Sequence, residues 1–306
     1  MSPRADPFET LARRLGGELV RAWPLTGGVS AATSALEVEL ADGARRKFVV
    51  RRPGGHYLRD LRERDVQLLE RLADAGLPAP CPRLLDAEGE IFGQPALVLD
   101  YLEGELDFGE ADLPAKLDAL ARQLAAIHAA PLPAFLPLLP RLDERAFAFF
   151  ARTPEAPDES LGESEVRAAL RRWPRPPSSN PDTLLHGDFW PGNVLWRDGQ
   201  ISGVIDWEDA AIGDPLYDLA ISRLDLLWAY GPSAVEPFTV AYARLAPQVD
   251  LTFLPWFDLG ACLRPCGQIS IWATSADAPA EAASRMRERH ASFRSKALAA
   301  YALLTR

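Results

Sequence analysis

Cysteine, histidine and long apolar runs are all scarce in this sequence of 306 residues. Its three cysteines, Cys81, Cys262 and Cys266, are too few and too scattered for a disulfide framework. Cys262 and Cys266 lie four residues apart on an expected helix, but no second cysteine pair or nearby histidine completes a zinc site, so we interpret them as buried thiols. This cysteine usage fits a reducing cytoplasm, which is the location we predict.

Neither a membrane span nor a signal peptide is predicted. The longest apolar runs, such as residues 132–139, are short and interrupted by prolines. Residues 1–10 contain two acidic side chains and lack the apolar stretch behind a basic start that marks a signal peptide. A content of 48% hydrophobic and 25% charged residues is ordinary for a soluble globular protein.

Positive charge is limited as well, and lysine supplies almost none of it. Lys47, Lys116 and Lys296 are the only lysines among 33 basic residues. The formal net charge of −10 argues against nucleic-acid binding, which requires a basic patch. An acidic surface is compatible with a cationic ligand, although it also serves solubility.

Several enzyme signatures are missing. The sequence has no G-x-x-x-x-G-K-[ST] phosphate loop, no G-x-G-x-x-G fingerprint and no G-x-S-x-G nucleophile elbow. These absences exclude a P-loop enzyme, disfavour a dinucleotide-binding fold and give no support to an α/β-hydrolase. The four histidines, at positions 56, 128, 186 and 290, are dispersed, which disfavours a metallophosphoesterase site.

The first hundred residues combine strand patterns with one helix. Residues 36–40 alternate between apolar and acidic side chains, residues 47–51 are rich in β-formers, and Asp42-Gly43 between them predicts a hairpin turn. Leucines along residues 58–72 form a helical stripe. Residues 96–99 form a short apolar segment that predicts a further strand.

The remainder of the chain is mainly helical in pattern. We expect helices at residues 113–128, 143–152 and 163–173 and a helical bundle from residue 214 to the end. The fold class predicted is therefore α+β. It consists of a small β-rich N-terminal lobe (residues 1–100), a connector (101–104) and a larger helical C-terminal lobe (105–306), a size that suits one large or two smaller domains.

The segment from Leu184 to Trp196 has the densest concentration of chemically useful residues. Apolar residues flank a polar loop, and a second short strand at residues 201–205 ends in Asp206. We interpret this as a hairpin that presents Asp188, Asn193 and Asp206. Carboxylate and amide oxygens are ligands suited to Mg²⁺, and a carboxylate set apart from the metal can deprotonate a hydroxyl.

The spacing of these three residues matches a phosphoryl-transfer template. In that template a catalytic aspartate is followed five residues later by asparagine, and then by a metal-binding aspartate after a strand. Taken singly, Asp188 and Asn193 are turn formers and Asp206 is a helix cap. Together with His186 and the flanking strands, they predict a phosphoryl-transfer site.

The same residues resemble the aminoglycoside phosphotransferase family, within the protein-kinase-like fold. The resemblance covers most of the chain, because its landmarks occur in order. They are residues 26–30 (TGGVS), 48–53 (FVVRRP), 76–80 (GLPAP), 97–104 (LVLDYLEG), 124–128 (LAAIH), 186–193 (HGDFWPGN), 205–208 (IDWE) and 213–220 (GDPLYDLA).

The resemblance implies a role for each matching position. Asp188 would be the catalytic base that accepts the proton of the substrate hydroxyl. Asn193 and Asp206 would hold Mg²⁺ against the phosphates of ATP, and His186 would be a structural residue of the catalytic loop. The two cofactors implied are ATP and Mg²⁺.

The resemblance also places a nucleotide site in the N-terminal lobe. Residues 26–34, with Gly27, Gly28 and Ser30, would cover the phosphates, since glycine lets backbone N–H groups approach closely. The backbone from Asp100 to Leu102 would meet the adenine ring.

Two positions depart from the family pattern. Arg51 stands where a lysine usually reaches the phosphates, and arginine suits that task, although Lys47 shares its face and is a rival. Asp65 replaces the glutamate that pairs with this basic residue. The alternative partner, Glu63, falls on the other face of the expected helix, so we predict an Arg51–Asp65 pair.

The sequence leaves the identity of the acceptor open. It is predicted to be a small molecule with a hydroxyl group, and Trp190 and Glu208 are candidate substrate contacts. The tryptophans also suit the core of the helical lobe. The acidic residues after the metal site suit local structure (Asp214, Asp218) or a solvated surface (Glu208, Asp209, Asp225). Choline, homoserine and sugar kinases share the scaffold, and a catalytically silent nucleotide-binding module is the alternative from another class.

Overall fold

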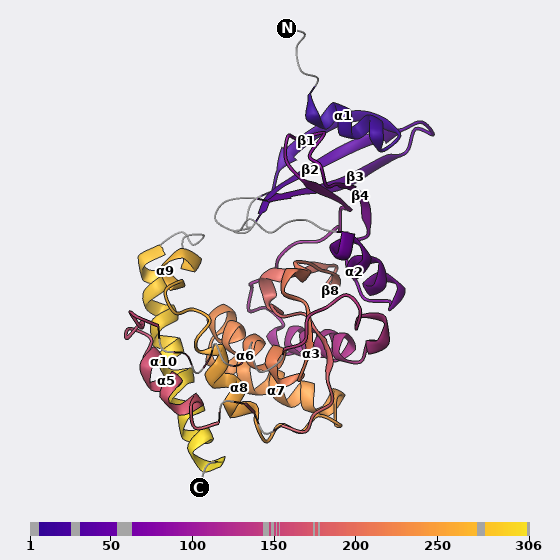
Figure 1. The fold of residues 1–306 in the computed structure, drawn as a ribbon. Coiled ribbons are helices and arrows are strands. Elements are labelled where there is room, and N and C mark those ends of the chain that lie inside the picture. The colour runs from indigo at the N-terminus through magenta and orange to yellow at the C-terminus, as the bar shows by residue number, and fades with distance from the viewer. Residues whose placement is uncertain are drawn as a thin grey trace. The chain divides into compact units, whose positions relative to one another are not determined.

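The computed structural model describes residues 6–25, 31–53, 63–142, 147, 150, 152, 154–173, 175–176, 178–273 and 279–304. The chain divides into two compact units. One comprises Met1–Gly104 with Ser202–Val204, and the other comprises Glu105–Ile201 with Ile205–Arg306 (Figure 1).

The first unit is built on a five-stranded antiparallel sheet with the strand order β1-β2-β3-β5-β4. Its strands are β1 (Gly17–Pro24), β2 (Ala31–Leu40), β3 (Arg45–Pro53), β4 (Pro82–Asp86) and β5 (Ala96–Asp100). Helix α1 (Pro7–Arg14) precedes the sheet, and helix α2 (Glu63–Asp74) lies between β3 and β4 in sequence.

The predicted hairpin is confirmed. Strands β2 and β3 pair antiparallel, and the turn at Asp42-Gly43 is closed by a backbone bond from Leu40 to Ala44 (2.9 Å). Gly43 has a φ of +80°, a conformation that costs glycine little. The strand at residues 96–99 is likewise confirmed as β5. Of the helix expected at residues 58–72, the structure describes α2, which extends two residues further.

Alternation along β3 sorts its side chains onto two faces. Phe48 and Val50 are buried in a core with Leu11 and Ala12 of α1, so this face of the sheet is covered by that helix. Lys47, Val49 and Arg51 therefore lie on the opposite face.

The second unit is mainly helical. Its helices are α3 (Leu113–His128), α5 (Glu163–Leu170), α6 (Leu216–Tyr230), α7 (Pro232–Leu245), α8 (Leu254–Ala261), α9 (Ile269–Trp272) and α10 (Pro279–Leu304), with single turns η1 (Leu132–Ala134), η2 (Pro191–Asn193) and η3 (Trp207–Asp209). The helices predicted at residues 113–128 and beyond residue 214 are confirmed. The expected helix at residues 163–173 ends at Leu170, and most of residues 143–152 lie outside the described part.

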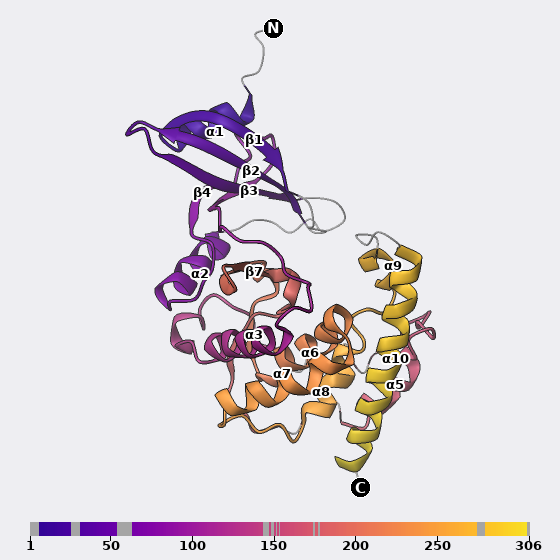
Figure 2. The same ribbon diagram turned by 180° about the vertical axis from the view of Figure 1, so that it is seen from behind.

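Helix α6 is the centre of this unit, because it packs against both α7 and α8, while α3 packs against α7. The long helix α10 runs beside α5 and α8, as both views show (Figures 1 and 2). Its Tyr301 donates a hydrogen bond to the carbonyl of Ala169 at 3.2 Å. The loops that precede α6 therefore lead into a helix that is packed against two others.

Helix α8 ends at Ala261, so Cys262 and Cys266 lie in the turns that follow it and not on a helix. All three thiols are free, and Cys262 is buried. Among the described residues no group of three His, Cys, Asp or Glu side chains is arranged to hold a metal ion. A search of those residues also finds no helix with the length and apolar character of a membrane span.

Candidate active site

A loop between two short strands contains the predicted catalytic residues. Strand β6 (Thr183–Leu185) leads into the loop, and β7 (Val194–Arg197) leaves it. These two strands do not pair with each other. Strand β6 pairs with β9 (Ala211–Gly213), and the hairpin is formed by β7 with β8 (Gln200–Val204), which ends two residues before Asp206.

Asp218 of α6 holds the start of this loop. Its carboxylate accepts hydrogen bonds from the backbone N–H groups of His186 (2.7 Å) and Gly187 (2.9 Å). It also contacts Nε2 of His128 at 3.3 Å, and Nδ1 of His128 contacts the Tyr242 hydroxyl at 2.6 Å. Burial alone would raise the pKa of Asp218, but its hydrogen bonds with His128 and with the loop hold that pKa below the ordinary value.

Gly187 is required by the geometry of the loop. Its φ is +84°, and an added Cβ atom would lie 2.1 Å from the carbonyl oxygen of Asp209. Only glycine allows the loop to approach this neighbouring backbone so closely.

His186 is a structural residue, as predicted. Its ring is fully buried and stacks against Trp207 with a centroid distance of 4.5 Å. Nδ1 accepts a hydrogen bond from the backbone N–H of Asp188 (3.2 Å), which places the ring proton on Nε2, where it is donated to the carbonyl of Ile205 (3.0 Å). The imidazole thus ties the catalytic loop to the end of β8.

Asn193 lies directly against Asp188. Its side-chain nitrogen donates to the backbone carbonyl of Asp188 at 2.9 Å and to the carboxylate oxygen Oδ2 at 3.0 Å. Since the amide nitrogen faces Asp188, the amide oxygen is the atom that can serve a cation. Asn193 is buried, while the Asp188 side chain is 26% exposed and accessible to a substrate.

Asp206 is held beside this pair through its neighbour in sequence. The N–H of Ile205 donates to the carbonyl of Asn193 at 2.9 Å, so the end of β8 lies against the loop. Asp206 itself has a φ of +64°, a left-handed conformation that is uncommon outside glycine and asparagine. Strain of this kind concentrates at functional sites.

The chemistry of these donors fits Mg²⁺. The metal takes oxygen ligands and is usually bound by one or two protein groups, with waters and substrate phosphates completing its octahedral shell. Asn193 and Asp206 would supply two oxygens of that kind. A cage of three or more acidic groups is not needed.

An ion pair that the sequence did not suggest engages Asp188. Arg264, in the turns after α8, directs Nη2 to the Asp188 oxygen Oδ1 and places Nη1 3.3 Å from Asp225 of α6. Asp225 is buried, so its interpretation as a solvated surface residue is wrong. Burial raises the pKa of Asp225 to about 7, against the opposing effect of Arg264. Burial would lower the pKa of Arg264, but the charges of Asp225 and Asp188 raise it above its ordinary value.

The other acidic residues that follow the metal site differ in exposure. Asp214 caps the start of α6 through Leu216 and binds Asn180, which confirms a local structural role, as for Asp218. Glu208 is half-buried and Asp209 is exposed, and both have interactions within the described part of the chain. The role of Glu208 as a substrate contact stays a prediction.

Trp190 lies at the rim of the catalytic loop. Its ring stacks on Phe108 with a centroid distance of 6.0 Å and covers Gly192, where an added Cβ would lie 2.2 Å from the ring. Its role as a substrate contact stays a prediction. Trp207 and Trp256 are buried, in agreement with a core role for the tryptophans.

In the first unit, Lys47 contacts Glu103 and Tyr101, which disfavours it as the phosphate-binding residue. Its Nζ lies 2.8 Å from Glu103 and 5.3 Å from the ring centroid of Tyr101, and the hydrogen bond to Glu103 raises the pKa of Lys47. Arg51 is further along β3 on the same face, paired across the ladder with Leu97. The arrangement therefore favours Arg51 over Lys47.

The predicted partner of Arg51 has the expected placement within its helix. Asp65 is half-buried on α2, whereas Glu63 is exposed, as the helical stripe indicated. Both Arg51 and Asp65 have interactions within the described residues. Their direct pairing stays a prediction.

The adenine-facing segment follows β5. The Asp100 carboxylate is occupied by Arg83, whose Nε lies 2.6 Å away, and the backbone N–H of Tyr101 donates to the carbonyl of Lys47 at 3.2 Å. A role for Asp100 and Leu102 through the backbone stays a prediction. Gly27, Gly28 and Ser30 lie outside the described residues.

Comparison with known proteins identifies relatives across most of the chain. The model of the phosphotransferase enzyme family (APH) matches residues 24–251. A homoserine kinase of Methylocella silvestris is 30% identical over 257 residues, which is 74% of this chain and 77% of that protein.

Solved structures show the same fold. The macrolide 2′-phosphotransferase MphH of Brachybacterium faecium superposes with a TM-score of 0.59 at 20% identity, over 92% of this chain and 97% of that one. A thermostable mutant of aminoglycoside phosphotransferase APH(4)-Ia, solved with AMP-PNP and hygromycin B, gives 0.63 at 20% identity, over 95% and 98%. The predicted α+β, protein-kinase-like fold is confirmed.

Proposed function

Because the chain belongs to the phosphotransferase enzyme family, we propose that it transfers the γ-phosphoryl group of Mg²⁺·ATP to a hydroxyl group of a small molecule. The observation that supports this most is the contact of Asn193 with Asp188, at 3.0 Å, next to the backbone bond that brings the end of β8 to Asn193. This proximity supports a site in which Asp188 would act as the base and Asn193 and Asp206 would bind the metal.

Asp188 orients the acceptor hydroxyl and accepts its proton as the oxygen bonds to the γ-phosphorus. The bond between that phosphorus and the bridging oxygen breaks, and ADP leaves. Asn193 and Asp206 would hold Mg²⁺, which neutralises phosphate charge when bound. Arg51 would neutralise further charge on the phosphates. Catalysis of this kind depends on positioning and electrostatics.

The first unit supplies the nucleotide side of this proposal. The face of β3 that holds Val49 and Arg51 is the side on which the nucleotide would lie, with the backbone of Asp100 to Leu102 at the adenine ring. Residues 1–100 would thus act as the nucleotide-binding lobe and residues 105–306 as the catalytic and acceptor lobe, joined by the connector at 101–104.

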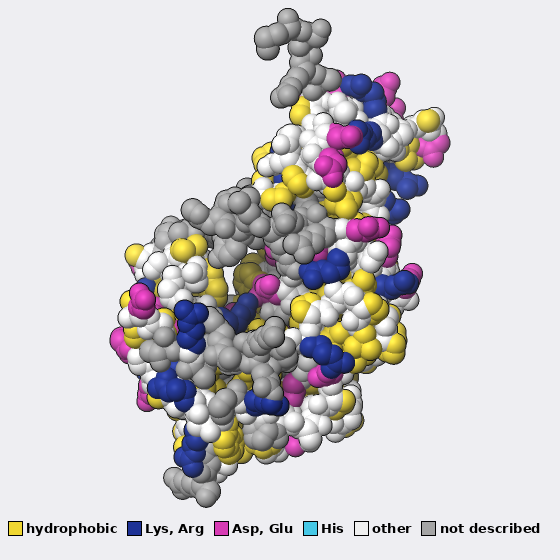
Figure 3. Space-filling view, in the orientation of Figure 1, with side chains coloured by type: hydrophobic (Ala, Val, Ile, Leu, Met, Phe, Trp, Pro, Cys, Tyr) yellow, Lys and Arg dark blue, Asp and Glu magenta, His cyan; other side chains and the backbone are white. Residues whose placement is uncertain are grey.

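The acceptor is a small molecule with a hydroxyl group. A relative is named homoserine kinase, so hydroxy amino acids are the first acceptors to examine. On the face shown in Figure 3, Lys and Arg side chains are scattered among Asp and Glu and the described residues form no continuous basic patch, which supports a small-molecule substrate over nucleic acid. The three free thiols suit a reducing cytoplasm as the place of reaction.

One observation favours the alternative of a catalytically silent nucleotide-binding module. Arg264 engages an oxygen of the proposed base Asp188. A silent module would bind Mg²⁺·ATP without consuming it in the presence of any acceptor.

ADP release by the purified protein decides between these two functions. Mg²⁺·ATP is supplied with hydroxy amino acids, hydroxy acids, amino alcohols, sugars, aminoglycosides and macrolides, and Asp188→Asn is the control. The proposal expects release that depends on one acceptor class and is lost in the control. Nucleotide binding without release across all classes would favour the silent module, and absence of nucleotide binding would exclude both.

A further inference from the structure

Helix α6 carries a row of buried polar residues toward the catalytic loop. Asp218, Ser222 and Asp225 are spaced i, i+4 and i+7, so they lie on one face of the helix. All three are buried. Buried polar side chains need partners, and each of these contacts the loop that contains Asp188 or a side chain bound to it.

The first two residues of the row contact the backbone of the loop. Asp218 accepts hydrogen bonds from the two backbone N–H groups that come before Asp188. The Ser222 hydroxyl lies 2.7 Å from the carbonyl oxygen of Phe189 and 2.8 Å from that of Asp218. The backbone is therefore held on both sides of Asp188, but neither contact reaches the Asp188 side chain.

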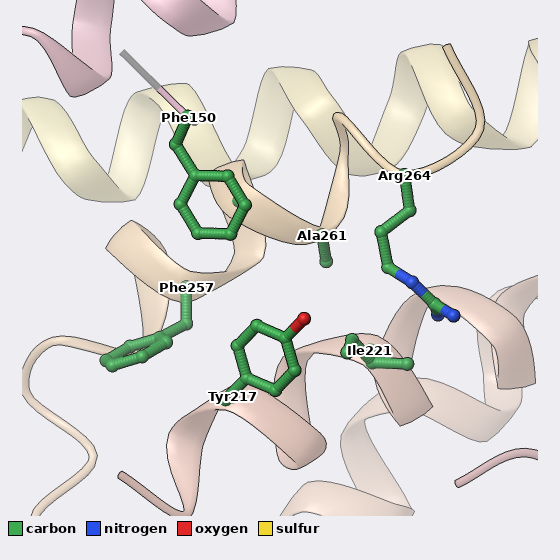
Figure 4. Close-up of a pocket in the computed structure, with 7 residues that line it drawn as sticks. Phe150, Tyr217, Ile221, Phe257, Ala261 and Arg264 are labelled. Atoms are coloured by element: carbon green, nitrogen blue, oxygen red, sulfur yellow. The ribbon is translucent and has the colours of Figure 1, made fainter. Parts of the chain in front are cut away.

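The third residue, Asp225, reaches that side chain through Arg264. Arg264 places Nη1 3.3 Å from Asp225 and directs Nη2 to the Asp188 oxygen Oδ1. Figure 4 shows Arg264 extending from the turn after α8 past Ile221, with its guanidinium directed away from the ring of Phe150. A guanidinium is planar and rigid, so a nitrogen fixed at Asp225 also fixes the nitrogen at Asp188.

Both carboxylate oxygens of Asp188 are held as a result. Arg264 contacts Oδ1, and the Asn193 amide nitrogen donates to Oδ2 at 3.0 Å. A carboxylate offers about four acceptor positions, so these two contacts fix its rotation and leave positions for a hydroxyl. The Asp188 side chain is also 26% exposed. Arg264 therefore orients Asp188 without closing it to a substrate.

Asp225 in turn keeps Arg264 in place. The Asp225 side chain is only 9% exposed, and in the described part of the chain its one ion pair is with Arg264. Breaking a buried ion pair is strongly unfavourable, because the remaining charge is left without a partner. The guanidinium is thus a lasting part of the site and not a latch that an incoming substrate releases.

From these contacts we propose that Arg264 and Asp225 are positioning residues for the base. Asp225 fixes Arg264, and Arg264 fixes the Asp188 carboxylate at the angle in which it receives the hydroxyl of the acceptor. This inference rests on the proposed function, because it assigns the role of base to Asp188. Neither residue is assigned a contact with the nucleotide, so their loss should lower turnover and spare nucleotide binding.

Two measurements on the full chain test this division. ADP release from Mg²⁺·ATP is followed with water as the acceptor and with the compound that stimulates the wild type, and calorimetry measures the affinity for Mg²⁺·ADP. Both are run at about pH 8, because burial raises the pKa of Asp225 to about 7. Arg264→Gln should lower kcat by about 10–100-fold with the Mg²⁺·ADP affinity within about twofold of the wild type.

The conservative variant Arg264→Lys should recover part of this loss. Lysine keeps the charge, but its ammonium group is a point charge without the rigid fork that spans Asp225 and Asp188. A kcat for Arg264→Lys between those of the wild type and Arg264→Gln is therefore expected. A kcat for Arg264→Lys no higher than that of Arg264→Gln would contradict a positioning role for the charge.

A double variant tests whether Asp225 acts through Arg264. Asp225→Asn alone should lower kcat by about tenfold, and Arg264→Gln/Asp225→Asn should be no slower than Arg264→Gln alone. The double variant also leaves no buried acid without its partner, so it remains informative if Arg264→Gln folds poorly. Losses that multiply in the double variant would show that the two residues act independently, which would overturn the proposal.

Arg223→Gln is the matched control. Arg223 also joins α6 to α8, through the buried Asp258 at 3.1 Å, so its replacement likewise strands a buried acid between the same helices. Its kcat should stay within about twofold of the wild type. A loss as large as that of Arg264→Gln would assign both effects to the packing of the helices and not to Asp188.

Asp188→Asn, measured in parallel, separates this inference from the proposed function. ADP release that is lost in Asp188→Asn but persists at the wild-type kcat in Arg264→Gln and in the double variant would leave the kinase and remove the positioning pair. ADP release that is absent from the wild type, or equal in wild type and Asp188→Asn, would remove the base and the positioning pair with it.

Discussion

The side-chain amide of Asn193 donates to both the carbonyl and the carboxylate of Asp188, at 2.9 and 3.0 Å. Asn193 thus holds the proposed base through its amide nitrogen, which leaves its amide oxygen as the atom that could bind a cation. The proposed base and the proposed metal ligand are thus coupled in geometry, but the proposed function separates their roles, because the metal would bind with the nucleotide and the base would act on the acceptor.

Replacement of Asp206 should therefore impair nucleotide use. Asp206→Asn removes a charge from the predicted Mg²⁺ site, so the KM for Mg²⁺·ATP should rise and the concentration of Mg²⁺ needed for half-maximal rate should rise with it. Steady-state kinetics over a series of Mg²⁺ concentrations measure both. An unchanged Mg²⁺ requirement would remove Asp206 from the metal site.

Asp218 should stabilise the fold, because it holds the loop that contains Asp188. Asp218→Asn disrupts hydrogen bonds from two backbone groups and a histidine, so the free energy of unfolding should fall by about 2–4 kcal/mol at pH 7. Urea denaturation measures this. Asp198→Asn makes the same chemical change at a side chain that is 92% exposed and should cost little.

The lowered pKa of Asp218 determines how its stabilising effect should change with pH. The pKa of Asp218 is lowered in the folded state, so its stabilisation is present above the unfolded value of 3.8 and is lost as the pH falls below it. The difference between wild type and Asp218→Asn should thus shrink in acid. A difference that grows below pH 3.8 would contradict the lowered pKa.

The contribution of Asp225 to stability should depend on pH with the opposite sign. Its pKa is raised from 3.8 to about 7 by burial, so the folded state binds this proton more tightly, and stability is lost as the pH rises between those values. Relative to Asp225→Asn, the wild type should lose up to about 4 kcal/mol between pH 4 and pH 8. Urea denaturation of both proteins isolates the contribution of Asp225, and parallel pH profiles would refute it.

The Arg51–Asp65 pair is tested by two neighbouring acids on α2. Asp65→Ala should raise the KM for ATP roughly tenfold, because Arg51, which is proposed to bind the phosphates, would lose its proposed charged partner. Glu63→Ala, on the exposed face, should leave the KM unchanged. Equal effects of the two substitutions, or no effect of Asp65→Ala, would exclude the pair.

The proximity of the candidate catalytic residues could be predicted because their signals are local. Asp188, Asn193 and Asp206 lie within one strand–loop–hairpin segment, and their spacing reflects that geometry. Arg264 gave no such signal, since it lies 76 residues from Asp188 and meets it only through the packing of α8 on α6. The burial of Asp225 depends on the same packing. A charge on one helix face cannot reveal which partner helix covers it.

Substitution of Asp188 tests the central claim most directly. Single-turnover and equilibrium measurements on Asp188→Asn, with Mg²⁺·ATP and the acceptor that stimulates the wild type, separate chemistry from binding. The account predicts a turnover reduced by about 100-fold or more with Mg²⁺·ATP affinity within about twofold of the wild type. Turnover that persists in Asp188→Asn, or a parallel loss of nucleotide affinity equal to that of Asp206→Asn, would contradict the assignment of Asp188 as the base.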